Sequence, residues 1–452
     1  MKFMKFIMFE VKSILLEKKI SNENEIKLLF DTESTLPCLF PLLFSLKNLR
    51  FQSLATQYSD LKALKDWYVF WYKKYSTSFC ESFYSSNYNF ELIKNDLDSF
   101  IIYLENNNDL ADITWLRSNT NVNYETISKK ISSLFKFYHF LIDDYLTIDK
   151  QPQLTRTEIK TIKFDIQQYM DFKNKKIRKF TNNSKNHKEH VYKSMTNEMV
   201  RVLYETITVS STKNLNLNNP FKNRPTQFRN FLIIHLLLNY GLRVGELMLL
   251  TVNSIKKSVL SESYSLIITN TDDEYDDRYR KPKIKNEFSY RVITLQERDY
   301  RFINIYIKEI RSDINSDILF TSLQAPYSSL SYSGINKIFK IIDNAVKNKI
   351  PHHFDNKAYD SIKSITPHVC RHTWAYLMLN YSFKKYENMN KLDNSVSNIG
   401  QNSLIKAQED LRVLGGWSPM SLMPNYYGKR FIVERANISN LERIINMSFG
   451  LK

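Results

Sequence analysis

A histidine, an arginine and a second histidine stand close together in TPHVCRHTWAYLML, residues 366–379. His368, Arg371 and His372 occupy positions i, i+3 and i+4, and Pro367 suits the first turn of a helix, so one helical face would carry all three side chains. Two histidines at this spacing could bind zinc, but the glutamate of an HExxH motif is missing and Arg371 would repel a cation. A guanidinium is better suited to an oxyanion, so we predict no metal here.

Two other short, glycine-flanked segments carry residues that could do chemistry. In GLRVGEL, Arg243 and Glu246 are three positions apart and would share a helical face among leucines. Taken alone, this segment is better explained by a buried structural ion pair than by a functional site. The segment VLGGWSPMSLMPNYYGKRF contains Trp417 and the pair Tyr426 and Tyr427. Alone, this third segment is compatible with ordinary packing.

Together, the three segments resemble the catalytic motifs of the tyrosine recombinases, also called phage integrases. That family has an arginine in a GLRxxEL segment, an HxxRH segment, a GH or GW dipeptide, and a tyrosine nine residues after it. The resemblance covers roughly residues 193 to 450. Trp417 stands where most members have histidine, and it can donate one indole N–H but cannot transfer protons. The matching residues here are Arg243, His368, Arg371, Trp417 and Tyr426.

The resemblance implies that a tyrosine hydroxyl attacks a DNA phosphodiester and forms a 3′-phosphotyrosine. Tyr426 would be the nucleophile, with Tyr427 as the alternative. Arg243 and Arg371 would bind the non-bridging phosphate oxygens, on which negative charge develops. His368 would donate a hydrogen bond to the phosphate or act as a base on Tyr426.

The family also has a lysine on a β-hairpin, which can protonate the leaving 5′-hydroxyl. KIKNEFSYRVITL resembles that hairpin and points to Lys285, with Lys281 and Lys283 as alternatives. Glu246 and His372 would support the site. Because a phosphotyrosine conserves the energy of the cut bond and arginines meet the phosphate charge, the resemblance implies no nucleotide, metal ion or other cofactor. The sequence also lacks a GxxxxGK[ST] loop.

The composition favours a polyanionic partner. Lysine and arginine number 64 against 47 acidic residues, which gives a formal net charge of +17. No apolar run approaches the roughly 20 residues that span a bilayer, so we expect DNA and no membrane as partner, and a cytoplasmic protein that is nucleoid-associated when bound to DNA. Cys38, Cys80 and Cys370 are too few and too far apart for a disulfide framework, and we expect reduced, buried thiols.

The elements that must position these residues are predicted to be mainly helical. Apolar residues recur at helical spacing around residues 61–71 and 131–141. SYSLIIT and SYRVITL have the residue types of two strands. We therefore predict a mainly α fold with a small antiparallel β-sheet. The family resemblance implies that a helical core-binding domain precedes a tyrosine recombinase catalytic domain. Loops are expected at 322–333 and 380–403.

The chain divides into four predicted parts. Residues 1–34 are an N-terminal extension that could be an arm or could pack on the helices that follow. Residues 35–150 are a helical, SAM-like core-binding domain that binds DNA, residues 151–192 a basic linker or strap, and residues 193–452 the catalytic domain with a C-terminal helix. The basic residues of the linker expected to contact DNA phosphates are Lys173, Lys175, Lys176, Arg178 and Lys179.

Two segments of the predicted catalytic domain point to subunit contacts. Residues 381–408 are longer and more polar than is usual in the family, and would form a loop over the site, a subunit contact or a surface insertion. In the family a terminal helix docks on a neighbouring subunit, although a helix packed on its own domain is the alternative. The apolar stripe of the tail consists of Val433, Ile438, Leu441, Ile444 and Ile445.

The predicted function is site-specific DNA recombination. Two domains would clamp the duplex, and four subunits would exchange strands through a Holliday junction, with a directionality factor as a further candidate partner. Integration, excision and inversion share this chemistry. Two alternatives stay open: a type IB topoisomerase uses similar residues to relax DNA without strand exchange, and a DNA-binding accessory protein would keep the fold without catalysis.

Overall fold

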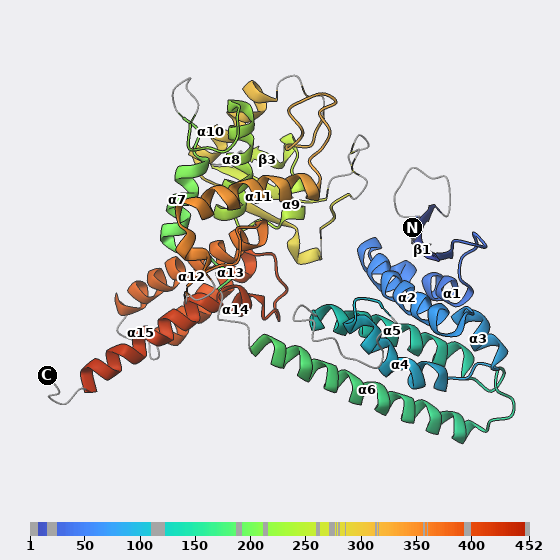
Figure 1. The fold of residues 1–452 in the computed structure, drawn as a ribbon. Coiled ribbons are helices and arrows are strands. Elements are labelled where there is room, and N and C mark those ends of the chain that lie inside the picture. The colour runs from blue at the N-terminus through green and yellow to red at the C-terminus, as the bar shows by residue number, and fades with distance from the viewer. Residues whose placement is uncertain are drawn as a thin grey trace. The chain divides into compact units, whose positions relative to one another are not determined.

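Helices dominate the computed structural model, and two small antiparallel sheets accompany them in the part of the chain that it describes (Figure 1). The predicted fold class is therefore confirmed, with one sheet more than expected. The chain divides into two compact units, Met1–Lys188 and Glu189–Lys452. The structure describes residues 8–15, 25–109, 123–186, 192–210, 216–258, 263–270, 276, 278, 281–284, 286–311, 314, 316–355, 358, 360–392 and 399–447.

The first unit is a helical bundle with one hairpin. Its elements are β1 (Phe9–Leu15), β2 (Glu25–Asp31), α1 (Leu39–Lys47), the 3₁₀ turn η2 (Leu49–Phe51), α2 (Leu54–Tyr75), α3 (Phe79–Ser85), α4 (Glu91–Glu105), α5 (Tyr124–Tyr145) and α6 (Arg156–Asn186).

Aromatic side chains fill the core of this unit. Trp67 is fully buried, and its ring meets those of Phe79 and Phe100 edge-on at centroid distances of 5.8 and 5.1 Å. The hairpin β1–β2 also packs here, with the Phe9 ring 5.5 Å from that of Tyr68. These aromatic residues of α2 to α4 therefore serve packing, and the described part of residues 1–34 lies against α1 and α2.

The basic segment predicted as a linker or strap is largely helical, because α6 covers most of it. Its apolar residues are sparse but fall on one helical stripe: Ile159, Ile166, Met170 and Ile177 are all buried in the core of the first unit. About one apolar residue every one to two turns is enough to hold a long helix against α5, although it leaves little periodicity to detect in the sequence.

The second unit contains the predicted strands and motifs. Its elements are α7 (Asn197–Ile207), α8 (Arg224–Asn239), α9 (Val244–Leu249), η3 (Val252–Ser254), β3 (Ile255–Lys257), β4 (Tyr264–Ile268), η4 (Glu287–Ser289), β5 (Arg291–Leu295), α10 (Glu297–Ile305), the π-helical η5 (Tyr306–Ile310), α11 (Tyr332–Lys349), η6 (Pro351–Phe354), α12 (Pro367–Leu392), α13 (Ile399–Leu414), α14 (Met423–Tyr427) and α15 (Lys429–Met447).

The three-stranded sheet has the order β3-β4-β5 and is antiparallel throughout. Residues 232–238 of α8 are all buried, so this helix forms the centre of the unit. Gly241 lies two residues after the end of α8 and has a φ of +60°, and a Cβ at this position would lie 2.2 Å from the indole of Trp374. Glycine is therefore required at the point where the chain turns towards α9.

The loop expected at 380–403 is helical in its described part, because α12 runs to Leu392 and α13 begins at Ile399. Its polar residues face one another between the two helices: Tyr386 donates to Asp410 (2.7 Å), and Asn390 donates to Ser403 (2.9 Å). Pairing of these polar side chains explains how a polar sequence forms packed helices here. Among the described residues, no helix combines the length and apolar character needed to span a membrane.

Candidate active site

Three arginines from three elements surround the carboxylate of Glu246. Arg243 precedes α9, Arg291 begins β5 and Arg371 lies on α12. Glu246 is 3% exposed, and its oxygens lie 2.5 Å from Arg243 Nη1, 2.9 Å from Arg291 Nη2 and 3.9 Å from Arg371 Nη1. Three guanidinium groups against one carboxylate leave a formal excess of two positive charges, which suits a bound oxyanion.

The first turn of α9 holds this arrangement in place. Glu246 accepts a hydrogen bond from the backbone N–H of Arg243 (2.8 Å) as well as from its guanidinium. Burial would raise the pKa of Glu246, but the hydrogen bonds and charge of Arg291, together with the charges of Arg243 and Arg371, hold that pKa below its ordinary value. The carboxylate is therefore charged at neutral pH.

Arg371 is 2% exposed and is oriented by backbone carbonyls. Its amino groups donate to the carbonyl oxygens of Gly241 and Gly415, the second at 2.6 Å, while its Nε has no hydrogen-bond partner among the described residues. Burial and the charge of Arg243 lower the pKa of Arg371 to about 9, although Glu246 opposes the shift. An anionic ligand beside this guanidinium would relieve an unfavourable excess of positive charge.

The two histidines of α12 are joined by a hydrogen bond. Their Nε2 atoms lie 3.1 Å apart, so one ring donates to the other. Burial, then His368 and Lys193, lower the pKa of His372 to about 3. Burial, then Lys193 and Arg371, also lower the pKa of His368. Both imidazoles are therefore neutral near pH 7, and the ring that donates in this pair keeps a free Nδ1 that can accept a proton.

The two adjacent tyrosines of α14 have different environments. Tyr427 is 9% exposed, and its ring stacks on His372 at 4.3 Å and lies 5.1 Å from the Trp417 ring. Tyr426 is 44% exposed, and its hydroxyl accepts a hydrogen bond from the Lys193 ammonium group, which also lies 4.9 Å from the ring centroid. The more accessible phenol is therefore that of Tyr426, the tyrosine predicted from the motif spacing.

Trp417 packs on Arg371 of the arginine cluster. Its side chain is 5% exposed, and its ring lies 4.7 Å from the Arg371 guanidinium carbon. The preceding Gly416 has φ +62°, and its carbonyl oxygen accepts from Arg243 Nη2 at 3.2 Å. This segment thus binds one arginine through its backbone and packs an aromatic ring on the other.

Arg291 and Lys193 were not selected from the sequence. Arg291 donates to both Glu246 oxygens, at 2.9 and 3.1 Å, and to Leu414 O at 2.8 Å. The sequence offered a signal for Arg291, because it is the arginine of the strand segment SYRVITL, which resembles the family's β-hairpin. Lys193 is the first residue of the predicted catalytic domain, directly after the basic linker, and nothing local distinguishes it from the lysines before it.

The active-site lysine is not identified by the structure. Lys285 lies outside the described residues. Lys281 is half-buried and Lys283 is exposed in the segment between β4 and β5. All three therefore remain in the predicted set.

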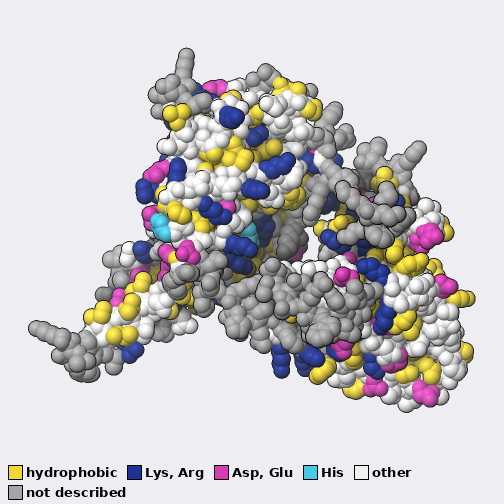
Figure 2. Space-filling model, in the orientation of Figure 1, with side chains coloured by type: hydrophobic (Ala, Val, Ile, Leu, Met, Phe, Trp, Pro, Cys, Tyr) yellow, Lys and Arg dark blue, Asp and Glu magenta, His cyan; other side chains and the backbone are white. Residues whose placement is uncertain are grey.

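The basic residues of α6 also differ from one another. Lys173 is 8% exposed, and its ammonium group lies 2.6 Å from both carboxylate oxygens of Asp98, so an acidic neighbour already occupies it. The exposed basic residues of this helix, which are open to phosphates, include Lys175, Lys176, Arg178 and Lys179. In the second unit, Figure 2 shows further Lys and Arg side chains, in dark blue, on the visible face around α11.

Solved structures similar to the chain include the Tn1549 transposon integrase in complex with transposon right end DNA, with 14% identity, 75% of this chain and 84% of that chain covered and a TM-score of 0.43. The XerH site-specific recombinase bound to difH substrate, in a pre-cleavage complex, is 15% identical over 88% of this chain and 83% of that one, with a TM-score of 0.44. The XerA recombinase is 14% identical over 81% and 93%, with a TM-score of 0.30. No curated protein matches the sequence.

A family model gives the stronger evidence. Residues 212–385 match the model of the phage integrase family. The matched range includes Arg243, His368 and Arg371, and it ends before Trp417 and Tyr426. The chain thus carries a domain of the phage integrase family, the tyrosine recombinases, as its motifs predicted.

Proposed function

We propose that this protein is a site-specific DNA recombinase that cuts and rejoins DNA strands through a 3′-phosphotyrosine at Tyr426. The phage integrase domain supports DNA recombination as the general function. The observation that carries the specific chemistry is the cluster of three arginines around Glu246. Its Arg371 lies 5.5 Å from the Tyr427 ring, and the next tyrosine along the chain, Tyr426, has an exposed phenol. Double-stranded DNA containing a recombination site is the substrate.

In the proposed cleavage step, the scissile phosphate takes the excess positive charge of the arginine cluster. Arg243, whose side chain is 20% exposed, and the partly hydrogen-bonded Arg371 stabilise the charge that develops on the non-bridging oxygens. Tyr426 forms the new P–O bond while the bond to the 5′-oxygen breaks. The neutral His368 accepts the phenolic proton, directly or through a water molecule.

Lys193 has a proposed role in activating the nucleophile. Its ammonium group donates to the Tyr426 hydroxyl and so stabilises negative charge on that oxygen as the proton leaves. The leaving 5′-oxygen takes a proton from the predicted hairpin lysine, Lys285 or one of Lys281 and Lys283. Reversal of the same steps, with a new 5′-hydroxyl as nucleophile, rejoins the strands.

The reaction is expected to proceed without an added metal ion or nucleotide. Arginine charges neutralise the phosphate, and the phosphotyrosine retains the energy of the broken ester. His372 and Trp417 have supporting roles. The His372 ring packs on Tyr427, and the Trp417 ring packs on Arg371, so both help to position the site residues. Trp417 is not required to transfer a proton.

Strand exchange is proposed to take place in a tetramer on DNA. The apolar stripe of α15 supports this, because Ile438, Leu441, Ile444 and Ile445 are 57%, 58%, 48% and 68% exposed. Apolar residues exposed along one helix are typical of a docking surface. A second copy of the chain is the proposed partner for it.

A nicked suicide substrate tests this function. The duplex contains the recombination site from DNA flanking the gene, and it is incubated in EDTA with wild type, Tyr426→Phe and Tyr427→Phe before denaturing electrophoresis. A covalent adduct in wild type and Tyr427→Phe, but not in Tyr426→Phe, is expected. Survival of the adduct in Tyr426→Phe would move the nucleophile to Tyr427.

Two further outcomes identify the alternative functions. DNA binding by wild type without any adduct, on several candidate sites, would favour a DNA-binding accessory protein. An adduct accompanied by relaxation of supercoiled DNA, but by no exchange between two labelled duplexes, would favour a type IB topoisomerase.

A further inference from the structure

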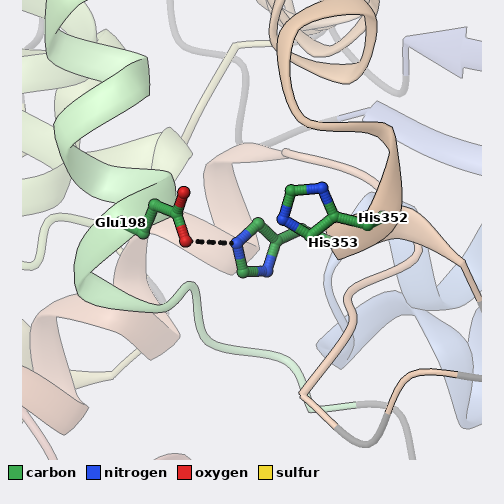
Figure 3. Close-up of side chains that lie close together, drawn as sticks. All are labelled: Glu198, His352 and His353. Carbon is green, nitrogen blue, oxygen red and sulfur yellow. Dashed lines mark hydrogen bonds and ion pairs between the residues drawn. The ribbon is translucent and has the colours of Figure 1, made fainter.

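Two histidines and a glutamate bring their side chains together away from the arginine cluster, where η6 meets the start of α7 (Figure 3). Glu198 lies in the first turn of α7, and His352 and His353 are consecutive in η6. One ligand atom of each residue lies within 4.8 Å of the others. We propose that Glu198, His352 and His353 bind a divalent transition metal ion, with Zn²⁺ as the expected ion.

The donor set fits this class of ion. Two imidazole nitrogens and one carboxylate oxygen are ligands that zinc and its first-row neighbours prefer, whereas calcium and magnesium prefer oxygen alone. Glu198 and His352 are exposed, so ions can enter from solvent and water can complete the coordination. Ligand atoms on a tetrahedral zinc ion are about 3.4 Å apart, given bonds of about 2.1 Å.

Small movements of exposed side chains would reach this geometry. His353 Nε2 and Glu198 Oε2 are 2.9 Å apart, so they would separate by about 0.5 Å as the shared proton is replaced by the ion. The widest separation, 4.8 Å at most, would close by about 1.4 Å. His352 and Glu198 can rotate to do so, since neither is buried.

The scaffold that carries the ligands is well held. The side chain of His353 is 8% exposed, its backbone N–H donates to Ile350 O at 3.2 Å, and its carbonyl accepts from Ile362 at 3.0 Å. The preceding helix is tied to α7 because Lys349 Nζ donates to Thr206 Oγ1 at 2.9 Å. One buried, fixed ligand and two adjustable ones therefore face a common point.

The charged groups around Glu198, His352 and His353 favour a bound cation, whereas those around the histidine pair of α12 do not. Glu198 contributes a carboxylate whose oxygen lies 2.9 Å from His353 Nε2. Two basic residues on the helices that flank the site are paired with acids: Arg201 of α7 with Glu205 at 2.6 Å and Lys347 of α11 with Asp343 at 2.6 Å. By contrast, His368 and His372 lie beside Arg371 and Lys193, which oppose a bound cation.

A bound ion would join the first turn of α7 to the end of α11. The chain enters α7 from residues 193–196, where Met195 donates its backbone N–H to Thr373 Oγ1 at 2.9 Å. The ion would therefore stabilise the entry into the second unit. This inference does not depend on the proposed recombinase activity, because it concerns binding and stability alone.

Metal binding to the full-length chain tests the proposal directly. The EDTA-treated and dialysed protein is titrated with Zn²⁺ by calorimetry and with Co²⁺ by visible absorption, and thermal unfolding is measured with and without one equivalent of Zn²⁺. The variants are His352→Asn and Glu198→Gln, both at exposed positions. The matched control is His139→Asn, an exposed histidine of α5 in the first unit.

We expect one Zn²⁺ per chain and a higher unfolding temperature in its presence for wild type and His139→Asn. Loss of one ligand should weaken binding at least about tenfold in His352→Asn and in Glu198→Gln, and should remove the thermal shift. Equal affinity in wild type and both variants would overturn the proposal. Loss of binding only in a His368→Asn variant would overturn it too, and would place the ion on α12. Circular dichroism of each variant verifies that it is folded. If His352→Asn is misfolded, the comparison of Glu198→Gln with wild type is the test.

Discussion

Replacing Glu246 with glutamine keeps the shape of the side chain but removes the negative charge shared by the arginines. Oε1 accepts from Arg243 Nη1 (2.5 Å) and Arg291 Nη1 (3.1 Å), and Oε2 accepts from Arg243 N (2.8 Å) and Arg291 Nη2 (2.9 Å). Glutamine has one acceptor oxygen, so it keeps two of these hydrogen bonds and presents N–H groups to the other two donors.

The expected cost is about 3 to 5 kcal/mol of unfolding free energy. Two charge-assisted hydrogen bonds are worth about 1.5 to 3 kcal/mol each. Removing one partner of a buried ion pair costs about 3 to 5 kcal/mol. Glu246 is 3% exposed, so solvent screening does not reduce the cost much. DNA cleavage should also fall by about 100-fold or more, since both flanking guanidiniums lose their orientation.

Urea denaturation of the intact chain measures the cost, and hydrogen exchange of the peptides that contain α9 and β5 assigns it to the second unit. Glu409→Gln is the matched control: it removes the same charge from a pair with Arg412 at 2.5 Å, but its side chain is 56% exposed. The control should cost less than about 1 kcal/mol. Sulfate should stabilise Glu246→Gln more than wild type, because the anion binds arginines that have lost their carboxylate.

A second signature is the pH dependence. The folded-state pKa of Glu246 is lowered, so its contribution to stability is complete above its unfolded pKa of about 4.3 and is lost as the pH falls through the folded-state pKa. The difference between wild type and Glu246→Gln should shrink in that acidic range. If Glu246→Gln costs no more than Glu409→Gln at pH 7, the electrostatic argument for this site is wrong.

Three further predictions concern the nucleophile, the histidines and the tail. Lys193→Ala should slow formation of the covalent adduct by about 100-fold at saturating DNA while DNA binding measured by gel shift stays unchanged, and equal rates would remove Lys193 from the mechanism. The folded-state pKa of His372, about 3, lies below its unfolded value of about 6.5, so the unfolded state binds protons more tightly. Acidification from pH 6.5 to 5 should therefore lower the free energy of unfolding by about 1.5 kcal/mol. In urea titrations, His372→Gln should reduce this dependence of stability on pH. Ile444→Asp should leave cleavage of the suicide substrate intact but prevent tetramers on DNA in sedimentation, whereas tetramers in the variant would argue against α15 as the contact.

Motif chemistry made part of this protein predictable from its sequence. Arg243, His368 and Arg371 stand in short segments whose residue types and spacing are themselves the signal, so these segments were enough to predict the family. The helical fold and the pairing of β4 with β5 also follow from local periodicity and strand propensity. These features depend on residues that are neighbours in the chain.

Tertiary structure decided the rest, because the relevant partners are far apart in sequence. Lys193 reaches Tyr426 across 233 positions, and His353 reaches Glu198 across 155. No local pattern predicts such contacts, which arise only when whole helices pack against one another. Packing also separated residues of the same type: adjacent tyrosines became one buried ring and one exposed phenol, and Lys173, unlike its basic neighbours on α6, was placed against an acid. Spacing and composition therefore determined the kind of chemistry, whereas burial and long-range contacts determined which side chains are available for it.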